Sequence, residues 1–179
     1  MASAIITRVS LEEFLSNPDP HYYDFHELHN GEIIEVPAPT NEHVDLHVRL
    51  EAVFRSILGG TYACLREFYY TLPGESRRAD VAVVLATRRA EQPKKVFSGA
   101  PDIIVEVLSE SNIAADLAHL RRIALQHGCS QFWIADPFDR MIEVYGKDGT
   151  WREYSIDDEI ALQLEGAERS LPIKSIFEA

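Results

Sequence analysis

Two acidic side chains interrupt segments of the chain that otherwise read as buried strands. Glu106 lies inside the apolar run at 103–108, and Asp80 opens the apolar run at 81–85. A carboxylate without a partner is very costly to bury, so each must be protonated, ion-paired or bound to a metal ion. Mg²⁺ and Mn²⁺ prefer hard oxygen ligands, and two carboxylates on neighbouring core strands meet that need.

The same two carboxylates are also compatible with a purely structural role. Buried carboxylates occur in ion pairs with arginine or lysine, and the strand assignments could be wrong. Glu27 is a third acidic candidate, just before the tight-turn pair Asn30-Gly31. Taken alone, Glu27 is most simply explained as an exposed hairpin carboxylate.

Two histidines suggest a different metal. His43 and His47 are four residues apart, which places both on one face of a helix and can hold Zn²⁺. However, Val44 follows His43, so the glutamate of an HExxH motif is missing. Because both histidines open an apolar stripe, a hydrogen-bonded packing role is favoured over zinc.

Several function classes lack their sequence signals. The chain has neither a glycine-rich phosphate loop nor a GxSxG elbow. Cys64 and Cys129 are too few for a disulfide framework and read as buried thiols. The net charge of -12 argues against tight nonspecific binding of nucleic acid. Basic doublets such as 77–78 and 121–122 are most simply solvated surface charge.

Periodicity and turn signals predict the elements that must position these residues. Ser10 and Glu13 form a capping-box pattern ahead of a short helix, and Asn30-Gly31 joins a hairpin. The main predicted segments are a helix at 41–58, a strand at 62–72, the strands of Asp80 and Glu106, a loop at 87–100, a helix from Asn112 to Gly128, a strand at 131–135, a β-meander at 141–145, 151–156 and 160–164, and a short helix after Pro172.

These elements predict one α/β (α+β) domain over residues 1–179, with a central mixed sheet, an N-terminal hairpin and a C-terminal meander. No apolar segment approaches the ~20 residues of a membrane span, so we expect no membrane partner. The first residues lack the pattern of a signal peptide, and we expect a cytoplasmic location. Exposed strand edges in the meander favour a homodimer.

Several motifs, in this order, resemble the Uma-type family of restriction-endonuclease-like proteins. They are Glu27-Leu28-x-x-Gly31-Glu32, Asn41-Glu42-His43 at a helix start, Ala79-Asp80-Val81-Ala82-Val83-Val84, the segment Ala-Pro-Asp-Ile-Ile-Val-Glu-Val-Leu-Ser-Glu-Ser at 100–111, and Gln-Phe-Trp-Ile-Ala-Asp-Pro at 131–137. The resemblance covers about residues 10 to 177.

The resemblance implies a fold and a reaction. The family is placed in the PD-(D/E)XK nuclease superfamily, which implies a restriction-endonuclease-like core with a mixed sheet flanked by helices. Asp80 would match the first metal-binding aspartate, Glu106 the second carboxylate and Glu27 the upstream acidic residue. The implied reaction is hydrolysis of DNA phosphodiester bonds with Mg²⁺ or Mn²⁺, and many enzymes of this type act as dimers.

One position departs from the family pattern. The catalytic lysine usually lies on the helix after the Glu106 strand, but Leu120 occupies that position here. Leu120 belongs to the apolar stripe and should face the sheet. His119 and Arg121 lie about 100° around the helix from it. Arg121 could bend back to stabilise charge, although it is a poor base.

The sequence therefore leaves two functions open. The chain is either a divalent-metal-dependent endonuclease, impaired where the lysine is missing, or a catalytically inactive nuclease-fold protein that acts as a binding or assembly module. The predicted site consists of Asp80 and Glu106 as metal ligands, with Glu27 and Arg121 as further catalytic candidates.

Overall fold

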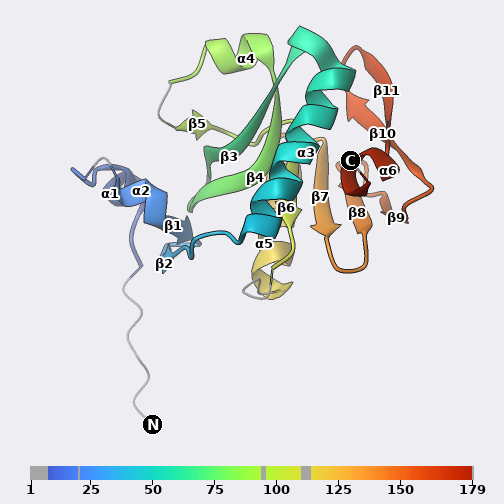
Figure 1. Cartoon of the computed structure of the whole chain (residues 1–179). Coiled ribbons are helices and arrows are strands. Elements are labelled where there is room, and N and C mark those ends of the chain that lie inside the picture. Colours follow the sequence, from blue (N-terminus) through green and yellow to red (C-terminus); the bar gives the residue numbers. More distant parts are fainter. Residues whose placement is uncertain (1–7, 20, 94–95, 110–113, 179) are drawn as a thin grey trace.

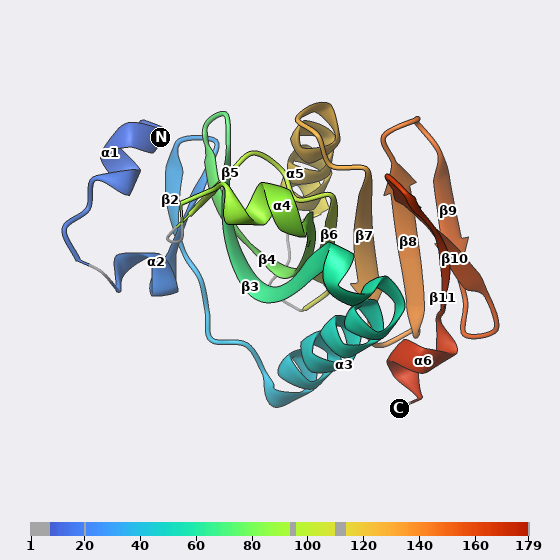
Figure 2. The ribbon, with the colours of Figure 1, turned by 90° about the horizontal axis from the view of Figure 1, so that it is seen from above.

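The computed structural model describes residues 8–19, 21–93, 96–109 and 114–178. A mixed sheet with the strand order β2-β1-β4-β6-β7-β8-β9 runs through the molecule, and β3 and β5 extend it beside β4. Helix α3 covers one face of this sheet and α5 covers the other, as Figure 2 shows from above. This arrangement confirms the predicted mixed sheet flanked by helices.

The N-terminal part contains two short helices and a hairpin. Helix α1 (Leu11–Leu15) begins with the predicted capping box, and α2 (Tyr22–Phe25) leads into β1 (His26–His29) and β2 (Glu32–Glu35). The turn between the strands places Asn30 at φ 49° and Gly31 at φ 85°. Positive φ at both positions is what a tight hairpin turn of this type requires, so the Asn-Gly prediction is confirmed.

Helix α3 (Asn41–Leu58) has the bounds that the sequence predicts. The Thr40 hydroxyl accepts a hydrogen bond from the backbone N–H of His43 and caps the helix. Every third or fourth residue on one side, including Leu46, Leu50 and Phe54, is buried against the sheet. A single 3₁₀ turn, η1 (Gly59–Thr61), then leads into the longest hairpin.

That hairpin consists of β3 (Tyr62–Leu72) and β4 (Glu75–Leu85). Strand β6 (Ile103–Val107) pairs antiparallel with β4 and parallel with β7 (Gln131–Asp136). Because β4 and β6 are central, both are covered on the two faces, which explains their nearly continuous apolar runs. Helix α5 (Ala114–Gln126) buries Leu117, Leu120 and Ala124, the described part of its predicted stripe.

A helix and a strand occur where the sequence predicted a loop. The loop predicted at 87–100 contains α4 (Ala86–Ala90) and β5 (Phe97–Ser98), which pairs with β3. Alanine and arginine are good helix formers, so the charge of this segment does not prevent a helical turn. The Lys94-Lys95 doublet lies outside the described residues, as do the predicted cap Asn112 and the first stripe residue, Ile113.

The C-terminal strands form two sheets. Strands β8 (Met141–Gly146) and β9 (Trp151–Tyr154) continue the main sheet, whereas β10 (Glu159–Leu164) pairs with β11 (Ala167–Pro172) in a sheet of their own. The predicted meander is therefore wrong at its third strand, because β10 pairs with β11 rather than with β9. Alternate residues of β10, starting at Ile160, pack in the core beneath α3. Helix α6 (Lys174–Phe177) follows, as predicted (Figure 1).

Two further expectations meet the structure here. No helix in the described part of the chain combines the length and the apolar character that crossing a membrane demands. Strand β9 ends the path of the main sheet, and its Trp151 is 58% exposed. An exposed edge strand of this kind is compatible with a homodimer, which stays a prediction.

Candidate metal centre

Asp80 lies where the long hairpin loses its regular pairing. The pairs Arg66↔Val81 and Phe68↔Ala79 flank a gap at Glu67 and Asp80, and Glu67 has a φ of 49°. Side chains of a regular strand alternate between faces. Here Ala79 packs in the core under α5, whereas Val81 packs in the core under α3. The irregularity therefore shifts the alternation at the residue that carries the carboxylate.

The carboxylate of Asp80 is surrounded by donors. Its Oδ2 accepts a hydrogen bond from the backbone N–H of Val107 at 2.7 Å and lies 3.2 Å from His43 Nε2. Its Oδ1 lies 3.4 Å from His47 Nε2. Burial alone would raise the pKa of Asp80, but the contacts with the two histidines lower it to about 2. Asp80 is therefore ionised at neutral pH.

Glu106 lies beside Asp80. The register Val81↔Val105 between β4 and β6 places Asp80 and Glu106 at adjoining positions of neighbouring strands. Burial, followed by the charges of Asp80 and Glu27, raises the pKa of Glu106 well above its ordinary value. The two carboxylates that the sequence predicts as a pair are thus brought together, and their charges repel each other.

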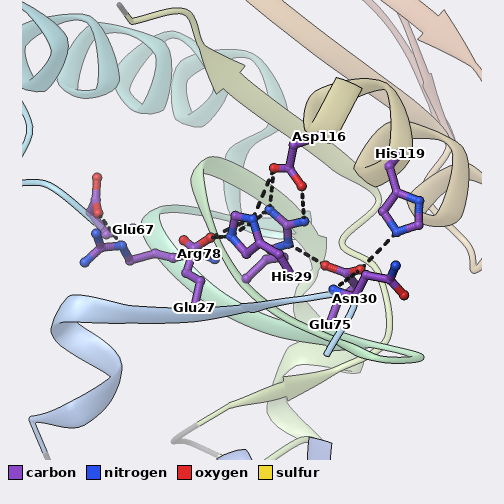
Figure 3. A network of polar contacts seen from close by, with 9 residues as sticks. Glu27, His29, Asn30, Glu67, Glu75, Arg78, Asp116 and His119 are labelled. Atoms are coloured by element: carbon purple, nitrogen blue, oxygen red, sulfur yellow. Dashed lines mark hydrogen bonds and ion pairs between the residues drawn. The ribbon is translucent and has the colours of Figure 1, made fainter. Parts of the chain in front are cut away.

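Glu27 is not the exposed hairpin carboxylate of the simplest sequence interpretation. Its side chain is 13% exposed, and it lies 2.7 Å from His29 Nε2. It also accepts a hydrogen bond from the backbone N–H of Arg78 at 3.2 Å. Figure 3 shows Glu27 directed toward His29 at one end of a polar network. This position lets the charge of Glu27 act on Glu106.

Arg77 is the centre of that network and corrects the interpretation of its doublet as solvated charge. Its side chain is 4% exposed, and its Nε donates to Glu75 at 2.7 Å. Its two terminal nitrogens donate to the two carboxylate oxygens of Asp116 at 2.8 and 2.9 Å. Arg77 Nη1 also lies 2.8 Å from His29 Nε2. Glu75 in turn lies 3.0 Å from His119 Nε2 (Figure 3).

The two histidines of α3 are at the site rather than merely packed beneath the sheet. The described side chains of His43, His47 and Asp80 place one ligand atom each within 4.8 Å of one another. His47 is 2% exposed, and its Nδ1 lies 3.1 Å from Glu67 Oε1. Burial lowers the pKa of His47, but Asp80 and Glu67 outweigh it and raise the value to about 9. The spacing of the histidines was the sequence signal for this cluster.

Arg121 is not brought to these residues. Its guanidinium carbon lies 3.8 Å from the centre of the Tyr145 ring, on the side of α5 that meets β8. Leu120 is 3% exposed and packs in the core under α5, as its place on the apolar stripe predicts. The geometry gives no support to the catalytic role that the sequence suggests for Arg121.

The donor set at Asp80 fits a divalent cation. One carboxylate, from Asp80 on β4, and two imidazoles from α3 converge. Glu106 on β6 is not a member of that cluster, but burial, followed by the charges of Asp80 and Glu27, raises its pKa. A cation here would relieve the repulsion between Asp80 and Glu106. The described residues around Asp80 supply histidines rather than a guanidinium, so the carboxylate is not already occupied by an arginine.

Comparisons with known proteins agree with this arrangement. The family model Uma2, described as "Putative restriction endonuclease", matches residues 11–174. A solved structure of a "putative nuclease belonging to DUF820" from Anabaena variabilis ATCC 29413 is similar, with a TM-score of 0.82 and 23% identity. The match covers 95% of this chain and 98% of that one, and it shows a shared fold. A search of curated proteins finds no match.

Proposed function

The chain belongs to the Uma2 family of putative restriction endonucleases, and from this premise we propose that it is a divalent-metal-dependent endonuclease that hydrolyses DNA phosphodiester bonds. One observation carries the proposal beyond the family. Asp80 and Glu106 lie side by side on central strands, and the charge of Asp80 helps to raise the pKa of Glu106. A cation bound at these carboxylates would offset the negative charge that helps to raise this pKa, which supports the proposal.

A bound Mg²⁺ or Mn²⁺ would polarise the phosphate and lower the pKa of the attacking water. The chain's own residues prepare that chemistry. Asp80 stays ionised because the histidines hold its pKa near 2, so it is ready to bind at neutral pH. Glu106, whose pKa is raised, would release its proton to solvent when a cation binds nearby, and its carboxylate would then add negative charge beside the ion. Glu27 adds negative charge beside Glu106.

A small basic area offers a place for DNA on an otherwise acidic protein. Arg121, Arg122 and Lys147 line a shallow groove of about 870 Å³ between α5 and the turn after β8. Lysine and arginine bind phosphates by releasing condensed counterions, so this groove is the proposed contact for the DNA backbone. Because the net charge is -12, we expect weak binding that falls steeply with added salt.

The decisive experiment is plasmid cleavage by the full chain with Mg²⁺ or Mn²⁺. We expect cleavage that EDTA abolishes and that is lost in Asp80→Asn and in Glu106→Gln. Glu153→Gln is the matched control, because Glu153 is an exposed carboxylate on β9. Cleavage that persists in both site variants would overturn the proposal.

The second candidate function is a catalytically inactive nuclease-fold protein that binds or assembles. Leu120 favours it, because this buried leucine occupies the position where the family usually has its lysine and cannot offset phosphate charge. Cation binding that depends on Asp80, without cleavage of any DNA form, would support this second function over the first.

A further inference from the structure

We propose that His43 and His47 bind the cation together with Asp80, so that the site selects a first-row transition-metal ion over Mg²⁺. This inference deepens the proposed function and rests on it. The sequence resemblance implied a site for Mg²⁺ or Mn²⁺ with Asp80 and Glu106 as its ligands, whereas the structure adds two nitrogen donors from a different element. The consequence is a change in which ion the protein prefers.

The start of α3 fixes the two rings. Thr40 caps the helix, so His43 falls in its first turn and His47 one turn later on the same side. The ring centres are 4.2 Å apart, and both Nε2 atoms are directed at Asp80, at 3.2 and 3.4 Å. No backbone change is needed to bring either imidazole to the carboxylate.

These separations match those within a coordination shell. Ligand atoms bound at about 2.1 Å from one ion, at angles between octahedral and tetrahedral, lie about 3.0–3.4 Å from one another. The Nε2–oxygen distances of 3.2 and 3.4 Å fall in that range. Small rotations of the side chains would complete the set, since all three ligand atoms already lie within 4.8 Å of one another.

The environment of His47 is the independent observation. Its Nε2 is fully buried and has no hydrogen-bond partner of acceptable geometry, although Asp80 Oδ1 lies 3.4 Å away. A buried polar atom without a partner destabilises the folded chain, so its presence calls for an explanation. A metal ion bound to that nitrogen provides one.

The carboxylate of Glu67 contacts the His47 ring on the nitrogen opposite to the one that faces Asp80. Glu67 lies 3.1 Å from His47 Nδ1, and Arg78 Nε holds Glu67 at 3.0 Å. A carboxylate that accepts a hydrogen bond from Nδ1–H keeps the proton on that nitrogen, so a metal ion would displace the proton on Nε2, and this is the usual arrangement behind a metal-binding histidine. Glu67 adopts a φ of 49°, which is rare for a residue other than glycine, and its side chain reaches His47 from that position. Figure 3 shows Arg78 directed toward Glu67.

Nitrogen donors change the preference of the site. Mg²⁺ favours oxygen ligands and water, whereas imidazole suits Fe²⁺, Co²⁺ and Zn²⁺, and affinity rises from Mn²⁺ toward Zn²⁺. With two imidazoles beside Asp80, we expect affinity to increase from Mg²⁺ through Mn²⁺ to Co²⁺ and Zn²⁺. The carboxylates supply charge, and the histidines supply selectivity.

The test is calorimetry of the metal-stripped full chain with each of these four ions, together with the visible absorption spectrum of the Co²⁺ form. We expect His43→Gln and His47→Gln to weaken Co²⁺ and Zn²⁺ binding by about tenfold or more and to alter the Co²⁺ spectrum, with little change for Mg²⁺. Glu67→Gln should weaken Co²⁺ binding less. His21→Gln is the control, because that ring is 77% exposed and far from the site in sequence.

The outcomes separate this inference from the proposed function. If cation binding requires Asp80 but is unchanged in both histidine variants, the inference is wrong and the carboxylate site remains. If the wild-type chain binds none of the four ions, both fail. Because His47 is fully buried, His47→Gln could unfold, and in that case the less buried His43 decides the question, since its side chain is 14% exposed.

Discussion

Two neighbouring groups of buried charges differ in how completely they are paired. The Arg77 network joins one guanidinium to Glu75 and Asp116, with Glu27 and His29 at its edge. Every nitrogen of Arg77 has a partner at 2.7–2.9 Å. In the Asp80 group, by contrast, two carboxylates adjoin, and a buried histidine nitrogen lacks a hydrogen bond.

This difference in pairing suggests different roles for the two groups. Paired charges tie β1, β4 and α5 together, and they leave nothing for a ligand to add. In the Asp80 group, Asp80 is paired with two histidines, but the raised pKa of Glu106 marks a carboxyl group whose charge is not compensated, and a bound cation could compensate it. This comparison assigns stability to the Arg77 network and supports the proposal that the Asp80 group binds a cation.

Arg77→Met tests the scaffold side and should have the largest effect. The variant leaves the carboxylates of Glu75 and Asp116 without their cation, so we expect the free energy of unfolding to fall by about 3–5 kcal/mol. Urea denaturation followed by circular dichroism measures it. Arg152→Met, an exposed position on β9, should change little. A loss as small as that of the control would mean that the network is not a structural element.

Glu106→Gln tests the other side and should have the opposite sign. It removes a buried carboxyl group whose pKa is raised by burial and by the charges of Asp80 and Glu27, so we expect the free energy of unfolding to rise by about 1 kcal/mol in EDTA. Asp80→Asn should lower it, because Asp80 is stabilised by both histidines. Chemical denaturation of both variants gives the comparison. Destabilisation by Glu106→Gln would show that this carboxylate is already satisfied.

The pH dependence of stability should follow Asp116. Burial raises its pKa, but Arg77 and His29 outweigh burial and hold the pKa well below its ordinary value. A depressed pKa adds stability above the unfolded value of about 3.9, and that stability is lost as the pH falls further. Asp116→Asn should therefore reduce the difference between the free energies of unfolding at pH 7 and at pH 3, measured by chemical denaturation. If the loss of stability below about pH 4 were the same in Asp116→Asn as in the wild type, groups other than Asp116 would be responsible for it.

Arg121→Met should have the smallest effect. The stacking of Arg121 on Tyr145 contributes about 1 kcal/mol or less, and the residue contacts neither group of charges. We expect unchanged Kd values for cations in calorimetry and a small shift in Tm. Loss of cation binding in Arg121→Met would instead support the role at the site that the sequence suggested for Arg121.

The sequence predicted the acidic half of the site because a charge in an apolar strand is visible without coordinates. Asp80 and Glu106 could be paired from the strand order alone. The histidines could be placed on one helix face, but which side of the sheet that face meets depends on how α3 docks. The shifted alternation at Glu67 and Asp80 leaves no trace in the hydrophobic pattern.

The network around Arg77 was beyond sequence reasoning for a similar reason. Its members come from β1, β4 and α5, and the separation between Arg77 and Asp116 is 39 residues. A doublet of arginines in a polar stretch looks the same whether it is solvated or buried. By contrast, the bounds of α3 and β3 followed from local caps and turns, which a short window contains.

The hydrogen bond from the Val107 amide to Asp80 Oδ2 joins β4 to β6 through a side chain rather than through the backbone. The contact between β4 and β6 at this end thus depends on Asp80 Oδ2, an oxygen that could instead bind a cation. Hydrogen exchange at this single amide would then follow the occupancy of the centre. If the proposed cation binds at Asp80, hydrogen exchange at the Val107 amide would report its binding.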